Sequence, residues 1–296
     1  MAEKRFILNF TPTGLIPTKE QTREVPVSAS EITEQVLKAV ELGVNMVHIH
    51  ARKSNGIPTY SKNIYADIIS GIRKYNKELV LCVSTSGRNF FEFEKRSEVL
   101  ELDGDLKPDF GSLTLSSLNF NKQVSINSPQ MIQCLAKKML ENNIRPELEA
   151  FDLGMINYAK YLIKKGLIKA PYYFNLILGN IACAQADMLS LGLMIRDLPE
   201  GSIWSAGGVG NSQLQMNAMA IISGGGVRIG LEDNIWFDQE RTKLASNIDL
   251  IKRILSIADA TGRKPYSSSE ARILLGCSKT QDKNICNRKL QTSAKK

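Results

Sequence analysis

The chain has 296 residues, of which 43% are hydrophobic and 23% charged, with a formal net charge of +8. No apolar run approaches the roughly 20 residues that span a membrane, and the N-terminal apolar stretch is too short for a signal peptide. We therefore expect a cytoplasmic protein that does not engage a membrane. The five cysteines are scattered without a Cys-x-x-Cys pair, which argues against a disulfide framework and a thiolate zinc site.

Basic residues are concentrated at the C-terminal end of the chain. In 278–296, six lysines and arginines stand against one acidic residue, Asp282, a net charge of +5 that leaves +3 for the rest. The segment has few apolar residues, which predicts a disordered, solubilising tail. We do not infer a nucleic-acid partner from it. The sequence thus predicts one folded domain over 1–277 and a basic tail over 278–296.

Along 1–277, short apolar segments alternate with longer amphipathic ones. Strands are predicted at 5–10, 45–50, 79–84, 111–115, 147–151, 172–178, 203–206 and 226–231. Helices are predicted at 30–42, 61–75, 129–142, 157–165, 184–196, 212–223 and about 238–261, with a short one after Ser267. Ser30 is the predicted N-terminal cap of the first helix.

This alternation predicts parallel strands joined by crossover helices. Eight repeats match an α/β protein of the (β/α)8 TIM-barrel class, in which catalytic groups lie at the C-terminal ends of the strands. The alternative is an open doubly wound sheet, which normally has a glycine-rich phosphate turn after its first strand. The segment Thr11-Pro12-Thr13-Gly14 does not fit that turn, so the barrel is favoured.

The only two histidines, His48 and His50, lie one residue apart in the second predicted strand. Strand side chains alternate between faces, so both imidazoles point the same way. Such a pair can chelate a divalent metal, and any further protein ligand must then be a carboxylate or a thiolate. The alternative is that the two histidines satisfy structural hydrogen bonds.

In the eighth predicted strand, Arg228, Gly230 and Glu232 alternate onto one face, and Asp233 follows where the loop begins. Glu232 is a candidate third metal ligand. Two histidines and a carboxylate are typical of catalytic zinc, although Fe(II) sites use the same set. Arg228 and Asp233 can form an ion pair that orients a general base, or an ordinary structural ion pair.

Several blocks along the chain match one family pattern: Thr13-Gly14, Val-His-Ile-His-Ala-Arg at 47–52, Gly-Ile-Pro at 56–58, Ser-Thr-Ser-Gly at 84–87, Pro-Glu-Leu-Glu at 146–149, Trp-Ser-Ala-Gly-Gly-Val-Gly at 204–210 and Val-Arg-Ile-Gly-Leu-Glu-Asp-Asn at 227–234. With these blocks the chain resembles the β-keto acid cleavage enzymes, a family that includes 3-keto-5-aminohexanoate cleavage enzymes. The resemblance spans about 6–276 and leaves out the basic tail. It implies a (β/α)8 barrel with one Zn²⁺ per chain and a homo-oligomer, either a dimer or a tetramer.

The resemblance also implies a role for individual residues. His48, His50 and Glu232 would bind the metal, which is the set proposed above, while Arg228 and Asp233 match a catalytic dyad. Ser84 and Ser112 match positions that hold the keto acid. The full set expected to contact the substrate is Ser84, Ser86, Gly87, Ser112, Thr114 and Glu149.

The implied reaction converts a β-keto acid and acetyl-CoA into acetoacetate and a new acyl-CoA by Claisen and retro-Claisen steps. Acetyl-CoA is then a co-substrate and the metal acts as a Lewis acid. One alternative is a metal-dependent aldolase or lyase that uses no CoA, and another is a catalytically silent metal-binding protein. A barrel hydrolase of the amidohydrolase type is disfavoured because it needs further histidines.

One position departs from the family pattern. Members that act on an amine-bearing substrate have a glutamate two residues after Thr-Gly, where this chain has Ile16. Ile16 cannot pair with an ammonium group, which disfavours a cationic substrate tail and favours a neutral or apolar one. Arg88, directly after the Ser-Thr-Ser-Gly block, could instead bind an anionic tail, or it could be an ordinary exposed loop residue.

Overall fold

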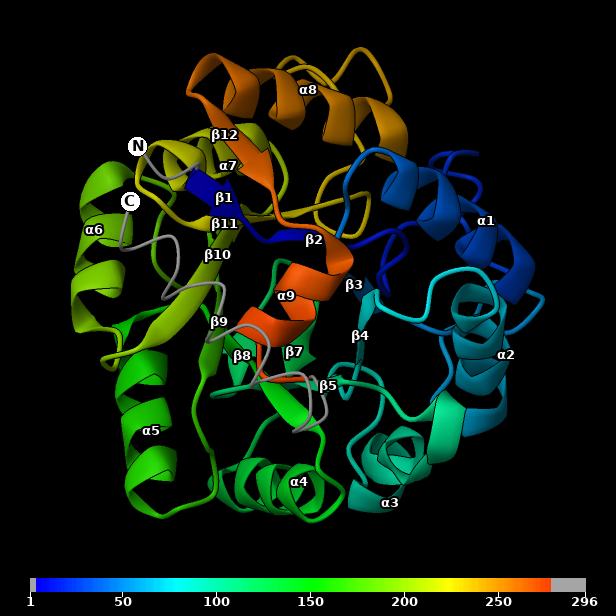
Figure 1. Cartoon of the computed structure of the whole chain (residues 1–296), viewed down its shortest axis with the longest axis vertical. Helices are drawn as coiled ribbons and strands as arrows, with labels where there is room; N and C mark the ends of the chain where they lie inside the picture. Colours follow the sequence, from blue (N-terminus) through cyan, green and yellow to red (C-terminus); the bar gives the residue numbers. More distant parts are fainter. Residues whose placement is uncertain (1–3, 278–296) are drawn as a thin grey trace, which may run out of the picture.

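The computed structural model describes residues 4–277, and the predicted tail at 278–296 lies outside the described residues. Eight parallel strands close into a barrel in the order β10-β11-β2-β3-β4-β5-β8-β9, with helices around the outside (Figure 1). The predicted TIM-barrel class is therefore confirmed. The barrel strands are β2 (Leu8–Phe10), β3 (Met46–Ile49), β4 (Val80–Val83), β5 (Phe110–Thr114), β8 (Arg145–Ala150), β9 (Tyr172–Leu178), β10 (Ser202–Gly208) and β11 (Gly226–Ile229).

The remaining elements surround this barrel. Two small sheets lie outside it: β1 (Lys4–Phe6) pairs with β12 (Arg263–Pro265), and β6 (Leu118–Asn119) pairs with β7 (Val124–Ser125). Two short 3-10 turns follow α3, at Glu98–Glu101 and Gly104–Leu106. The helices are α1 (Ala29–Glu41), α2 (Lys62–Arg73), α3 (Phe93–Ser97), α4 (Pro129–Glu141), α5 (Leu153–Lys164), α6 (Met188–Asp197), α7 (Ser212–Ile222), α8 (Asn247–Ala260) and α9 (Ser268–Leu274).

Three predicted features of the elements were wrong. The strand predicted at 5–10 is two strands, because β1 turns away to pair with β12 while β2 enters the barrel. The last long helix begins at Asn247, not near 238, because Ser246 caps it and the preceding residues form a loop. Ser28 caps α1 in place of Ser30, in a capping box with Glu31. The other predicted ends agree to within four residues.

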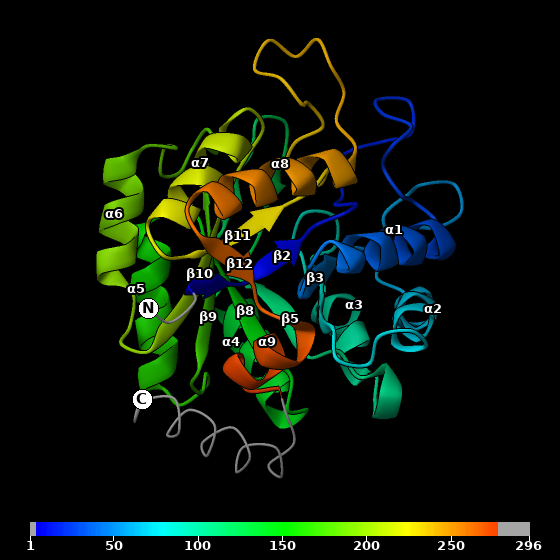
Figure 2. The same ribbon diagram turned by 45° about the horizontal axis from the view of Figure 1, so that its top comes forward.

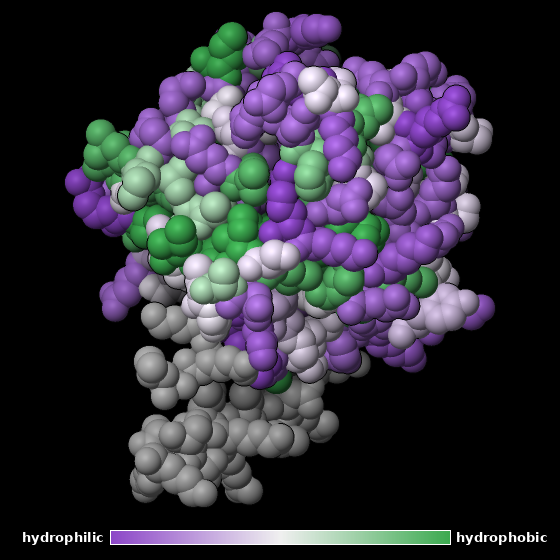
Figure 3. All heavy atoms as spheres, turned by 90° about the horizontal axis from the view of Figure 1, so that it is seen from above, coloured by the Kyte–Doolittle hydropathy of each residue, from purple (hydrophilic) through white to green (hydrophobic). Residues whose placement is uncertain are grey.

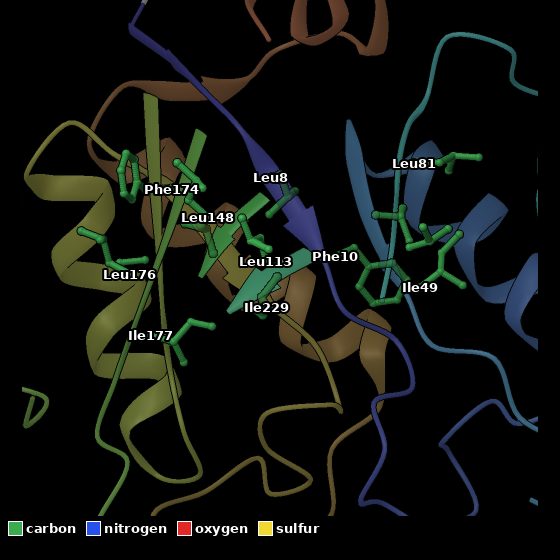
Figure 4. Close-up of a cluster of buried hydrophobic side chains, with 14 of the residues drawn as sticks. Leu8, Phe10, Ile49, Leu81, Leu113, Leu148, Phe174, Leu176, Ile177 and Ile229 are labelled. Atoms are coloured by element: carbon green, nitrogen blue, oxygen red, sulfur yellow. The ribbon is translucent and has the colours of Figure 1, made fainter. Parts of the chain in front are cut away.

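The hydrophobic core lies between the barrel and the helices. Leu8, Leu113, Leu148 and Phe174 come from four different strands, and each is buried on the outer face of the barrel (Figure 4). Helices α1, α2, α4, α5 and α7 add apolar faces to the same cluster. Burial of this continuous apolar layer holds each helix against its strands.

The N-terminal end of the barrel is closed by an apolar plug. Ile7, Met46, Val80 and Phe110 pack there in a separate buried cluster, together with side chains of α9 and its C-terminal flank. Figure 1 shows α9 lying across this end of the barrel. A ligand can therefore reach the barrel interior from the opposite end, where the strands finish.

At the C-terminal end of the barrel, the loops after β2 and β11 extend in the same direction (Figure 2). The outer surface beside α8 is largely hydrophilic, with smaller hydrophobic areas between the polar residues (Figure 3). Among the described residues, no helix is both long and apolar enough to cross a bilayer. The projecting loops surround the site described next.

Candidate active site

The mouth of the barrel brings together His48 on β3, His50 directly after that strand, and a carboxylate after β11. The Nε2 atoms of His48 and His50 lie 3.1 Å apart, and Nε2 of His50 lies 3.2 Å from Oε1 of Glu232. Both histidines are buried and Glu232 nearly so. The structure thus brings together all three predicted metal ligands.

A network below this cluster fixes the orientation of His48. Its Nδ1 lies 2.5 Å from Oε2 of Glu147 on β8, which leaves Nε2 directed at His50 and Glu232. Asn9 donates to the other oxygen of Glu147 at 2.7 Å, and the Cys82 thiol donates to Oε2 at 3.3 Å. A metal-binding histidine usually donates its second N–H to a carboxylate in this way.

Glu147, Asn9 and Cys82 were not among the residues predicted for the site. A signal was present, because Glu147 is two residues before Glu149 on a strand and therefore shares its inward face. The same alternation puts Cys82 on the face of Ser84. What the sequence did not provide was the strand register, which places β8 where Glu147 can reach the histidine across the barrel interior.

Arg228 links the carboxylates of the site. Its Nε lies 2.9 Å from Oδ2 of Asp233 and one terminal nitrogen lies 2.8 Å from Oε1 of Glu232, so the expected ion pair with Asp233 is present. The other terminal nitrogen, 3.8 Å from Glu149, has no hydrogen-bond partner among the described residues. Thr114 donates to Glu149 at 2.7 Å. Arg228 therefore holds three carboxylates around one buried guanidinium.

These contacts set the protonation of the buried groups. Burial opposes a charge on His48, but Glu147 and Glu232 outweigh it and raise the pKa of that imidazole to about 9. Although burial acts against it, His50 and Arg228 hold the pKa of Glu232 well below its usual range. Burial raises the pKa of Asp233, with Arg228 acting in opposition. Asp233 is thus the more basic of the two neighbouring carboxylates.

A cavity of about 750 Å³ opens above the cluster. It is lined by most of the predicted site residues and by parts of the loops after β2, β4, β9 and β11. His48 lies buried beneath its floor and Gly87 lies outside its wall. The predicted residues that line the cavity are His50, Ser84, Ser86, Ser112, Thr114, Glu149, Arg228, Glu232 and Asp233.

The loop after β4 is fixed by its own hydroxyl groups. Oγ of Ser84 accepts the N–H of Ser86, and Oγ of Ser112 accepts the N–H of Thr85 at 3.1 Å. Among the described residues, neither the Ser84 nor the Ser112 hydroxyl donates to another group, so both can donate into the cavity. Gly87 packs against the backbone of Ile126, where a Cβ would come within 2.2 Å of the carbonyl oxygen.

Gly14, in the loop after β2, packs directly against the third predicted ligand. It has a positive φ of 63°, and a Cβ there would lie 2.6 Å from Cγ of Glu232. The buried Arg52 guanidinium donates to the Gly14 carbonyl from two nitrogens, at 2.7 and 3.1 Å. This clamp holds the loop on Glu232, with Leu15 and Ile16 directed to the cavity.

The donor set fits a divalent metal ion. Nε2 of His48, Nε2 of His50 and an oxygen of Glu232 converge, and Oε2 of Glu232 is buried without a hydrogen-bond partner among the described residues. An unpartnered buried carboxylate oxygen is costly unless a cation or donor satisfies it. His48 also lies near Cys82 and Glu147, but Glu147 contacts its Nδ1 and neither Cys82 nor Glu147 lines the cavity.

Comparisons with known proteins identify the family of the chain. A family model described as beta-keto acid cleavage enzyme matches residues 5–277. A 3-keto-5-aminohexanoate cleavage enzyme of Fusobacterium nucleatum subsp. nucleatum is 33% identical over 93% of this chain and 99% of its own length. A 3-oxoadipate:acetyl-CoA acetyltransferase of Cupriavidus necator is 32% identical over 91% of this chain and 94% of its own.

Solved structures show the same fold. The apo structure of ObcA superimposes with a TM-score of 0.75 at 18% identity, covering 86% of this chain and 65% of ObcA. This chain therefore corresponds to about two thirds of that protein. At such low identity the likeness concerns the fold alone.

Proposed function

We infer that this chain, which belongs to the β-keto acid cleavage enzyme family, converts a β-keto acid and acetyl-CoA into acetoacetate and a new acyl-CoA. The observation that carries the proposal is the convergence of a two-histidine, one-glutamate cluster with the Arg228–Asp233 pair at one barrel mouth. The names of the acetyl-CoA-dependent relatives support the same co-substrate. Those names differ in the keto acid, so the family does not fix the substrate's far end.

We assign the metal as Zn²⁺, one per chain, held by His48, His50 and Glu232, with Glu147 orienting His48. The imidazole and carboxylate donors match the ligands that catalytic zinc uses. A bound zinc ion would polarise the keto and carboxylate oxygens of the substrate and acidify the CH₂ group between them. Other divalent metals accept the same ligands, so metal analysis decides the identity.

The remaining side chains position the substrate and move its proton. Ser84 and Ser112 would donate hydrogen bonds to the substrate carboxylate, because both hydroxyls line the cavity with a free proton. Asp233 takes a proton from the acidified CH₂, and its raised pKa suits this role. Arg228 holds the Asp233 carboxylate in place and stabilises the charge that develops there.

The carbon skeleton then changes in two balanced steps. The substrate carbanion attacks the acetyl carbonyl carbon, and the CoA thiolate leaves as the new carbon–carbon bond forms. The thiolate next attacks the original keto carbon, and the old carbon–carbon bond breaks to give the new acyl-CoA. Asp233 returns its proton to the departing acetoacetate carbanion, so no net proton is consumed.

The other predicted contacts take supporting positions. Glu149 and Thr114, joined by their hydrogen bond, would flank the substrate beside Arg228. Ser86 fixes the loop after β4 through hydrogen bonds on both sides. For Gly87, the structure supports a packing role in that same loop in place of the predicted substrate contact.

We also propose a cytoplasmic homo-oligomer, a dimer or a tetramer. Support comes from exposed apolar side chains at the start of α6, where Met188 and Leu189 are each more than two-thirds exposed. Apolar patches of this kind often mark contacts between subunits. Light scattering of the purified chain gives the oligomer size, and Met188→Asp should lower it if α6 lies in the interface.

The decisive experiment measures acetoacetate formation from acetyl-CoA and a panel of β-keto acids with cationic, neutral and anionic tails. His48→Ala should lower the rate by about 10³-fold or more, since it removes a ligand of a Lewis acid that contributes several kcal/mol. Circular dichroism serves as the folding control. Cleavage of a keto acid without acetyl-CoA would instead support a lyase, and turnover that survives both His48→Ala and chelation would contradict the metal assignment.

A further inference from the structure

The cavity has a second arginine, which the reaction above does not use. Arg88 lies in the loop after β4, half-buried, and lines the cavity. Its guanidinium carbon lies 3.3 Å from the centroid of the Phe120 ring, which follows β6. Arg88 is therefore not an ordinary exposed loop residue, because an aromatic face supports its charged group inside the site.

Arg88 differs from the other arginines near the site in having no acceptor. The guanidiniums of Arg52, Arg96, Arg228 and Arg241 all donate to carbonyl or side-chain oxygens. Among the described residues, the guanidinium of Arg88 makes no hydrogen bond and no ion pair. A half-buried cation without an anion loses hydration that nothing in the chain replaces. Its position and chemistry fit an anionic ligand.

The carboxylates that line the cavity are already engaged by an arginine. The carboxylates that line it are Glu149, Glu232 and Asp233, and all three lie around Arg228. The loop after β2 contributes Leu15 and Ile16 and no acid. An ammonium tail would therefore find no free carboxylate, whereas an anionic tail would find Arg88.

The loop holds Arg88 in position before any ligand binds. Oγ of Ser86 accepts the backbone N–H of Arg88, and the Gly87 carbonyl accepts the N–H of Ile126 at 3.0 Å. Phe120 in turn packs edge-on against Phe151, with ring centroids 5.9 Å apart. A cation fixed in this way loses little conformational freedom on binding, which favours selectivity.

We propose that Arg88, supported by Phe120, binds a carboxylate at the far end of the substrate, so that the enzyme acts on a β-keto dicarboxylic acid. This inference rests on the proposed function and specifies its substrate class. A CoA phosphate is the less suitable partner, because the long pantetheine arm separates the phosphates from the thioester. Arg88, by contrast, lines the same cavity as Glu232 and Asp233, which lie at the reacting end.

The test compares a β-keto dicarboxylate with its mono-methyl ester at the far carboxyl, a matched pair that differs by one charge. Binding is measured by calorimetry and turnover by acetoacetate formation, for the wild type, Arg88→Met, Arg88→Lys and Lys122→Met. Arg88→Met should weaken binding and lower kcat/KM for the dicarboxylate on the order of 10- to 100-fold, and leave the ester nearly unchanged. Arg88→Lys should recover part of the loss. Lys122→Met removes an exposed cation from the same wall and should cost less.

Each other outcome has a distinct meaning. Equal losses for dicarboxylate and ester, or a loss confined to the KM for acetyl-CoA, would overturn the assignment of Arg88. A wild type that binds the ester at least as tightly as the dicarboxylate would also overturn it. Arg88-dependent binding of the dicarboxylate without turnover of any keto acid would support the role of Arg88 and refute the proposed reaction.

Discussion

The two faces of the barrel strands differ sharply in what they carry. On β8, Leu148 points outward into the apolar layer under the helices, while Glu147 and Glu149 on either side point inward to charged partners. On β9, Phe174 faces outward, and Tyr173 and Asn175 lie in a buried hydrogen-bond chain. The outward face holds the molecule together, and the inward face concentrates costly buried polar groups around one mouth. Stability and activity should therefore respond to different substitutions in the same strands.

The largest expected effect concerns the inward face at the mouth. Asp233→Asn keeps the size of the side chain but removes the basic oxygen, and general-base catalysis contributes about 10² to 10⁴ in rate. We expect kcat to fall within that range while metal content stays at one per chain. Metal analysis and steady-state kinetics on the same sample check this. A near-normal kcat in this variant would show that Asp233 is not the general base.

The next effect concerns the outward face. Phe174→Ala empties a fully buried site and should lower the free energy of unfolding by about 3 to 5 kcal/mol, as truncations of buried aromatic residues do. Urea unfolding measures the loss, and activity per folded molecule below the transition should stay close to that of the wild type. If kcat falls as steeply as for Asp233→Asn, the proposed separation between the two faces is incorrect.

A smaller effect is expected one contact away from the proposed metal ligands. Glu147→Gln keeps the shape of the side chain but weakens the acceptor that orients His48, and outer partners of this kind typically affect metal affinity by about 10- to 100-fold. Competition with a chromophoric chelator measures the affinity. Cys82→Ala, which removes a weaker contact to Glu147 at 3.3 Å, is the matched control and should change the affinity less. Equal affinities in the wild type and Glu147→Gln would argue against the orienting role.

The smallest effect lies on the outer layer of helices. Ser28 caps α1 because its Oγ accepts the N–H of Glu31. Ser28→Ala removes this cap and should lower the free energy of unfolding by about 1 kcal/mol without affecting catalysis. Ser30→Ala, two residues further on, is the control and should cost less. Thermal unfolding of both variants decides which serine caps the helix.

Long periodic segments made the fold predictable from the sequence. The alternation of apolar runs and amphipathic helices was sufficient to identify eight repeats, and strand alternation made His48, His50 and Arg228 visible as inward-facing residues. Glu232 was predicted on the same face of the eighth strand, but β11 ends at Ile229 and Glu232 lies in the turn that follows it. The predicted boundaries of the strands and helices were wrong where a tertiary contact determines them. β1 leaves the barrel because β12, some 260 residues later in the chain, pairs with it. The stretch from about 238 to 246 was wrongly predicted as helix, and in the structure it belongs to the loop before α8.

The parts of the site that the sequence did not reveal depend on contacts across the barrel. Glu147 meets His48 through β8 and β3, which are not neighbours in the barrel. Phe120 reaches Arg88 from a short hairpin outside the barrel. Neither pairing has a local motif, because each follows from strand order and loop packing, which a single sequence does not specify.

The contact between Gly14 and Glu232 determines which parts of the site can be redesigned independently. The loop after β2 carries two different constraints within three residues: Gly14 leaves no room for a side chain beside Glu232, while Ile16 ends in the open cavity, 47% exposed. The Arg52 guanidinium fixes the Gly14 carbonyl, which lies between these two positions in the chain. Substitutions at position 16 should therefore reshape the cavity without disturbing the proposed metal site, whereas any side chain at position 14 would displace Glu232.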